Sequence, residues 1–219
     1  MNMSTGFPMG AQAQQIAYVR KYVNEQMPRL PYHNPSHAQD VAHTADFLGN
    51  LEGVKAPQRF LLETAGWLHD VVYKPHALNN EELSAADAAR VMNLVGYDAG
   101  QIGIVKRLIL ATKPNARPRT HLEKIIKDAD MWNLATNEFI DRSEAYRADL
   151  GVAADAKWYT GLKTLLDDHT YYTTIARQLL NPGLEYNRTV AQSLYDRALI
   201  PGPGLAKEEK VFDAHTQLV

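Results

Sequence analysis

The chain has 219 residues, of which 45% are hydrophobic and 22% are charged, and its formal net charge is -2. This is the size of one globular domain with a substantial core, and the near-neutral charge excludes a broad basic surface for nucleic acid. The absence of cysteine excludes disulfides, a zinc ribbon and a cysteine nucleophile, and it favours a reducing compartment.

Neither a targeting signal nor a membrane span is expected. Residues Met1 to Gly10 lack the basic stretch and following apolar stretch of a signal peptide. No apolar run approaches the roughly 18 residues that would indicate a transmembrane helix. We therefore expect a soluble, cytoplasmic protein with a disordered N-terminus over residues 1–8, a helical domain over 9–200 and a tail over 201–219.

The first helix is predicted from about residue 9 to Met27, where apolar residues recur at helical spacing, and it ends at Pro28–Pro31. A second helix should follow at Asn34, because asparagine is a good N-cap and the next residue is a proline, which suits the first helical position.

Two histidines flank the start of this second helix. His33 lies just before it and His37 lies in its first turn. His37 shares one helical face with three apolar residues: Val41, Ala45 and Leu48. We therefore expect His37 to face the core. It either belongs to a functional site there or is an ordinary hydrogen-bonded core histidine.

An adjacent histidine and aspartate, His69 and Asp70, end the next apolar helical segment. A carboxylate removed from water needs a partner, and a divalent metal ion suits both an imidazole and a carboxylate. The alternative is a partly exposed His–Asp pair at a helix end. Residues 74–80 are predicted to form a loop, and Asn79 or Asn80 should cap the helix that follows, with Glu81 and Glu82 in its first turn.

A further helix should stop at Lys113, before a proline. The segment after it places an aspartate, Asp130, in an otherwise apolar helical stripe made by Leu122, Ile126 and Leu134. Asp130 either joins a buried site or accepts hydrogen bonds from a neighbouring turn. Asp128 should point elsewhere, either supporting a ligand or at the surface.

The C-terminal third is predicted to be helical as well. A long core-facing stripe includes His169, which we interpret as a core histidine rather than a ligand; its other members are Trp158, Leu162, Leu165, Tyr172, Ala176 and Leu179. Asn181–Gly183 should form a turn before a last helix over residues 185–199, which Pro201–Gly204 ends. No alternating strand pattern occurs, so the fold class is all-α: a single compact bundle of eight or nine helices.

Two ordered motifs resemble a known family. The first runs from Tyr32 through His33, Asn34 and His37 to Val41, and it is similar to the first motif of cyclic-nucleotide phosphodiesterases. The second comprises Trp67–Tyr73, Asn80–Ala85, Ile109–Lys113 and Asp128–Asp130, and it is similar to a small bacterial branch of HD-domain proteins. Together they resemble the HD superfamily of metal-dependent phosphohydrolases over residues 30–135.

This resemblance implies a metal site and an activity. It assigns His37, His69, Asp70 and Asp130 as ligands of a divalent ion, whose identity stays open among Mn, Mg, Fe, Co, Ni and Zn. Asp70 is also assigned a catalytic role. The implied reaction is hydrolysis of a phosphate ester or anhydride by a metal-activated water, and the number of ions stays open.

The resemblance also assigns His33 as the catalytic acid that protonates the departing oxygen, with a surface histidine in a turn as the alternative. Lys74, His76, Glu81 and Lys113 are candidates for substrate binding, although ordinary solvated loop residues are equally compatible with their positions. The expected partner is a small phosphorylated, nucleotide-like molecule, with no nucleic acid and no membrane, and a homodimer stays open. Alternative functions are a cyclic-nucleotide-type phosphodiesterase and a non-catalytic regulatory domain that binds metal or nucleotide.

Overall fold

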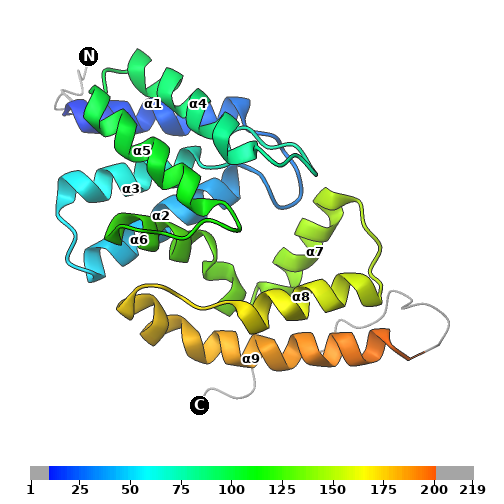
Figure 1. Ribbon diagram of the computed structural model, residues 1–219. Helices are drawn as coiled ribbons and strands as arrows, with labels where there is room; N and C mark the ends of the chain where they lie inside the picture. Colours follow the sequence, from blue (N-terminus) through cyan, green and yellow to red (C-terminus); the bar gives the residue numbers. More distant parts are fainter. Residues whose placement is uncertain (1–9, 201–219) are drawn as a thin grey trace, which may run out of the picture.

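The structure, a computed structural model, describes residues 10–200, and all regular secondary structure within them is helical (Figure 1). The elements in chain order are α1 (Ala11–Gln26), α2 (Pro35–Leu51), α3 (Ala56–Leu68), α4 (Asn80–Leu94), α5 (Ala99–Thr112), α6 (His121–Asp130), the short 3-10 helix η1 (Trp132–Ala135), α7 (Phe139–Leu150), α8 (Ala156–Asp168) and α9 (Thr174–Ala198). The all-α prediction is confirmed. The expected disordered N-terminus and C-terminal tail lie outside the described residues.

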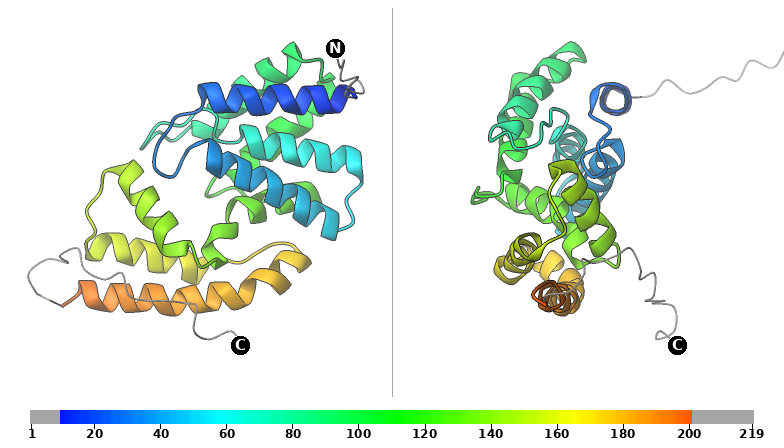
Figure 2. Two further views of the ribbon diagram at one scale, coloured as in Figure 1. Left: turned by 180° about the vertical axis from the view of Figure 1, so that it is seen from behind. Right: turned by 90° about the vertical axis from the view of Figure 1, so that its right-hand side faces the viewer.

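The helices pack around a central pair, α2 and α3 (Figures 1 and 2). Helix α6 packs on α2, α5 contacts α3, α4 and α6, and α1 covers α3. Helices α8 and α9 lie side by side at one end of the molecule, with η1 against α9, and α7 rises from that end (Figure 1). Across residues 10–200, no helix combines the length and the apolar character that crossing a membrane requires.

The close contact between α2 and α3 depends on small side chains. Ala38, Ala42 and Ala45 on α2 are completely buried, and Gly66 of α3 faces them. A Cβ atom added to Gly66 would lie 2.4 Å from the Cα atom of Ala42. The two backbones therefore touch at a distance that only glycine permits.

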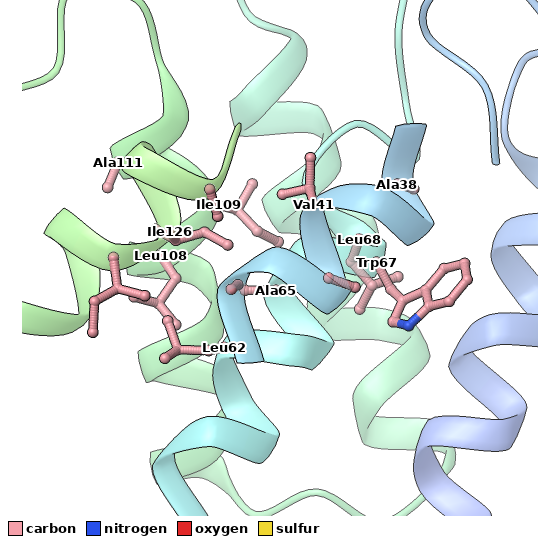
Figure 3. Packing of buried hydrophobic residues seen from close by; sticks show 14 of the residues in the cluster. Ala38, Val41, Leu62, Ala65, Trp67, Leu68, Leu108, Ile109, Ala111 and Ile126 are labelled. Atoms are coloured by element: carbon pink, nitrogen blue, oxygen red, sulfur yellow. The ribbon is translucent and has the colours of Figure 1, made fainter. Parts of the chain in front are cut away.

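The core around this pair combines residues from four helices (Figure 3). Leu62 and Leu68 of α3 are completely buried, as are Ile109 of α5 and Ile126 of α6. The indole of Trp67 points to the other side of α3, toward α1, where the guanidinium of Arg20 lies 5.7 Å from its ring centroid. From Leu61 to Leu68, α3 is thus buried on nearly every side, rather than on the single face that its apolar spacing suggests.

Helix α6 ends earlier than predicted, at Asp130, and Leu134 lies in η1, although its side chain is buried as expected. Asp128 is completely buried and accepts hydrogen bonds of 2.8 Å from the backbone N–H groups of Tyr172 and Thr173. The expectation that Asp128 lies at the surface or behind a ligand is therefore wrong. Instead, the Asp128 side chain attaches the linker between α8 and α9 to α6.

The prediction of one continuous apolar stripe in the C-terminal third is also wrong, because α8 ends at Asp168 and the chain is extended at His169. Leu165 and Leu179, two members of the stripe, are 40% and 49% exposed. His169 is half-buried and packs edge-on against Tyr171, with ring centroids 4.6 Å apart. Burial lowers its pKa to about 4, so it is a packed neutral histidine, as predicted, but in a linker rather than on a helix.

The predicted turn at Asn181–Gly183 does not exist, because α9 continues through it. Pro182 is exposed, so its missing N–H and its ring are accommodated on the solvent side. Gly183 is needed for packing, since a Cβ atom there would lie 2.0 Å from the carbonyl oxygen of Ala135 in η1. Burial of Leu180 and Leu184 on either side outweighs the local preference for a turn.

We predict that Gly66→Ala destabilises the protein by about 3 kcal/mol or more, because the added methyl group must push α2 and α3 apart. The matched control is Gly161→Ala in α8, where a Cβ atom would meet nothing within 4 Å. Removing the backbone freedom of that glycine should stabilise the protein by roughly 0.5–1 kcal/mol. Urea unfolding of both variants measures the difference, and equal effects of the two substitutions would contradict the close contact.

Candidate functional site

The start of α2 positions the first site histidine. The Asn34 side-chain oxygen accepts hydrogen bonds from the backbone N–H groups of Ser36 (2.9 Å) and His37 (3.2 Å), and Pro35 occupies the first turn. This is the predicted cap. The His37 side chain is buried and faces α3 and α6, as its helical stripe predicts.

The end of α3 positions the second histidine. The Nδ1 atom of His69 lies 2.8 Å from the carbonyl oxygen of Gly66. Because a carbonyl can only accept, Nδ1 carries the proton and donates it, and neutral His69 has a bare lone pair at Nε2. This is the ring orientation that metal-binding histidines adopt.

Four side chains, from α2, from α6 and from the two residues that follow α3, converge at one point. The Nε2 atom of His69 lies 3.0 Å from Oδ2 of Asp70 and 3.3 Å from Oδ1 of Asp130. The Nε2 atom of His37 lies 3.7 Å and 3.5 Å from the same two oxygens. His37, His69 and Asp70 form a candidate metal-binding group, with ligand atoms within 4.8 Å of one another, and Asp130 closes it on the α6 side.

The electrostatics of this His–Asp cluster call for a cation. Burial alone would lower the pKa of His69, but the charges of Asp70 and Asp130 raise it well above its ordinary value. Burial alone would raise the pKa of Asp130, but His69 and His37 hold it well below its usual range. Within residues 10–200, the buried Nε2 atom of His69 has no hydrogen-bond partner. Two carboxylates facing an imidazole are stable only with a positive charge beside them, which either a proton on Nε2 or a divalent ion can provide.

His33 lies beside the cluster and is held by a residue that the sequence did not indicate. Asp149, at the end of α7, accepts hydrogen bonds from the His33 backbone N–H (2.9 Å) and from its Nδ1 atom (2.7 Å). A third hydrogen bond comes from the backbone N–H of Tyr32. The Nε2 atom of His33 therefore points toward the cluster, 3.7 Å from Asp70 Oδ2. Burial lowers the pKa of His33, although the charge of Asp70 acts in the opposite direction.

Asp149 could not be recognised in advance, because nothing in its local sequence distinguishes it from a surface aspartate. An aromatic side chain completes the surroundings of His33. The ring of Tyr73 stacks on the imidazole, with centroids 3.4 Å apart. The alternative of a surface histidine in a turn is wrong, since His33 is 7% exposed.

The four candidate substrate-binding residues lie in or near the loop that follows Asp70. The side chain of Asn80 holds Lys74 through both of its backbone groups, at 3.0 Å each, and the Lys74 side chain is exposed. His76 has a positive φ of 63°, and its Nε2 atom lies 3.1 Å from the carbonyl oxygen of Leu150. This loop therefore also contacts the end of α7.

Of the other two candidates, Glu81 lies in the first turn of α4 and Lys113 directly follows α5. Lys113 pairs with Glu82. Glu81 is half-buried, and burial, reinforced by the charge of Asp70, raises its pKa. Glu81 thus comes within electrostatic range of the His–Asp cluster, whereas the charge of Lys113 is already paired.

A cavity of about 320 Å³ adjoins the cluster. His37 and Asp130 line its inner end, and residues of α2, η1 and α7 line the rest. None of Lys74, His76, Glu81 and Lys113 contributes to its lining. Apart from His37 and Asp130, the space beside the cluster is therefore lined by residues that were not among the predicted site residues.

No protein-family model matches this sequence, and no curated protein matches it either. Solved structures do match. The crystal structure of Bacillus subtilis YpgQ in complex with ADP aligns with a TM-score of 0.65 and 22% identity, covering 88% of this chain and 98% of that one. Selenomethionine YpgQ aligns with a TM-score of 0.64 and 21% identity, covering 88% and 97%. The two proteins share a fold.

We predict that Asp149→Asn destabilises the protein by about 1–3 kcal/mol, because the carboxylate accepts three hydrogen bonds and an amide has only one oxygen to accept them. The control is Asp141→Asn on the exposed face of the same helix, which should change stability by less than about 0.5 kcal/mol. Denaturant unfolding compares the two variants. A neutral Asp149→Asn would show that this carboxylate does not hold His33.

Proposed function

We propose that this chain is a divalent-metal-dependent phosphohydrolase of the HD superfamily, with residues 9–200 as its domain, and that it cleaves a phosphate ester or anhydride of a small nucleotide-like molecule. The observation that carries the proposal is the His–Asp cluster, in which a buried imidazole lone pair faces two carboxylates. The shared fold with YpgQ, whose crystal structure contains ADP, supports a nucleotide as ligand.

His37, His69, Asp70 and Asp130 would hold the ion. Two neutral imidazoles and two carboxylates suit Mn, Fe, Co, Ni or Zn, and they leave coordination positions open on a five- or six-coordinate ion. When bound, such an ion would lower the pKa of a coordinated water and stabilise charge that develops on phosphorus. The Nδ1 hydrogen bond of His69 to Gly66 would keep the Nε2 lone pair directed at the ion.

His33 would supply the proton for the departing oxygen. Asp149 orients its ring through Nδ1, so Nε2 is the atom that would carry and release the proton. Tyr73 covers one face of the imidazole and limits its rotation. The acid would thus sit at the edge of the cluster, where it can reach a substrate without occupying a ligand position.

We predict that adding 1 mM Mn²⁺ to chelator-treated protein raises the melting temperature by several degrees. Binding at 100 times the dissociation constant stabilises a protein by about 2.7 kcal/mol, and each kcal/mol corresponds to roughly 2–4 °C for a domain of this size. Asp130→Asn should lose most of this shift, whereas Asp168→Asn, an exposed aspartate at the end of α8, should keep it. A shift of the same size in both variants would place the metal elsewhere.

The function is tested by phosphate release from a panel of nucleotides and from 4-nitrophenyl phosphate esters, with Mn²⁺, Co²⁺, Ni²⁺ or Mg²⁺. We predict turnover of at least one nucleotide, and we expect His33→Ala to lower its kcat by roughly 10²–10⁴. The loss should be smaller for the nitrophenyl esters, whose leaving group departs without a proton. The assay compares kcat and metal content for both substrate types.

His121→Ala serves as the control for this substitution, because His121 is an exposed histidine that pairs with Glu52 at 3.4 Å, away from the cluster. It should leave both rates unchanged. If His33→Ala loses the metal or slows both substrate types equally, His33 is a ligand or an orienting residue. A metal-loaded protein that turns over nothing in the panel would favour a regulatory domain.

A further inference from the structure

The cavity beside the His–Asp cluster is placed to receive the part of a substrate that is not phosphate. Its inner end consists of His37 and Asp130, so a molecule in the cavity would have one end at the cluster. From there the lining continues along α2 to η1, the residues that connect η1 to α7, and Arg142 in the first turn of α7. Its volume of about 320 Å³ lies at the lower end of the range of roughly 300–1,000 Å³ that small-molecule sites occupy.

The charges of the outer wall argue against phosphate in this part of the cavity. Arg142 donates hydrogen bonds to Asp40 (2.6 Å) and Glu138 (3.1 Å), so its positive charge is already paired with two carboxylates. Asp130 at the cluster end adds a third carboxylate to the lining. An anion would be repelled by this surplus of negative charge, whereas an uncharged group would not be.

The remaining lining groups suit an aromatic heterocycle. Trp132 of η1 is partly exposed and lines the cavity, and Phe47 supports its ring edge-on, with centroids 6.1 Å apart. Indole faces stack on nucleobases. Next to it, Asn133 and Asn137 offer carboxamides, which carry both a donor and an acceptor for the edge of a base.

These carboxamides are available for a ligand. Asn133 receives one long hydrogen bond, of 3.5 Å, from the Tyr32 hydroxyl to its side-chain oxygen. The Asn137 side chain is exposed and makes no hydrogen bond to another group in residues 10–200.

We propose that the cavity between α2, η1 and α7 is a nucleobase subsite in which the base stacks on Trp132 and the carboxamides of Asn133 and Asn137 contact its edge. The inference rests on the proposed function and narrows it: the substrate is a nucleotide rather than a small phosphorylated metabolite. The phosphate end lies at the cluster, and the base lies away from the loop that holds Lys74 and His76.

The test uses adenosine, which has no phosphate to cleave, so its binding does not depend on turnover. Titration is followed by ligand NMR and by quenching of tryptophan fluorescence. Trp132→Ala should weaken adenosine binding by roughly 10-fold or more, as expected for loss of a stacking partner. In Trp132→Phe, binding should fall less, but the fluorescence quenching should disappear, because the quenched indole is gone.

Trp158→Phe is the matched control, since Trp158 is a partly buried indole of α8 that does not line the cavity. It should keep both the affinity and the quenching. Asn137→Ala, a change at an exposed position that leaves the packing intact, should also weaken adenosine binding.

The results separate this inference from the proposed function. If wild-type protein does not bind adenosine, or if Trp132→Ala and Trp158→Phe bind it equally well, the subsite is wrong even where nucleotides are hydrolysed. If binding depends on Trp132 but no nucleotide is hydrolysed, the subsite stands and the phosphohydrolase proposal fails.

Discussion

The arrangement of the site depends on the contact between α2 and α3 at Gly66. This glycine lets the two backbones touch, and its carbonyl oxygen also receives the Nδ1 proton of His69. One residue therefore sets both the distance between the two histidine-bearing helices and the direction of a lone pair. Because His37 lies in the first turn of α2 and His69 directly follows α3, their imidazoles meet near the contact between the two helices.

The cluster costs free energy in the absence of a cation, since it buries two carboxylates beside imidazoles. Hydrogen bonds made by residues outside the cluster offset part of this cost. Asp149 secures His33 from α7, and Asn34 secures the first turn of α2. The Asp149 carboxylate and the Asn34 side-chain oxygen each accept hydrogen bonds from backbone N–H groups and also position a site histidine. Loss of either acceptor would therefore change both the stability of the fold and the geometry of the site.

Local patterns in the sequence were sufficient for the helices before residue 130, the cap at Asn34 and the inward direction of His37 and Asp130, since helical spacing and capping act over a few residues. Features that depend on distant contacts were not predictable. Asp128 and Asp149 accept hydrogen bonds from backbone groups over 40 residues away. The turn expected at Asn181–Gly183 is helical because η1 packs against Gly183.

The last turn of α6 joins three separate parts of the molecule. Lys127 donates to the carbonyl oxygens of Ala111 (3.2 Å) and Lys113 (2.5 Å), at the end of α5. Asp128 holds the linker between α8 and α9, and Asp130 faces the cluster. Each residue of a helix is rotated by about 100° from the last, so one residue inserted upstream in α6 would turn all three side chains away from their partners at once. The register of this helix is therefore fixed by three independent attachments, and homologous chains should tolerate length changes in the loop before α6 rather than within it.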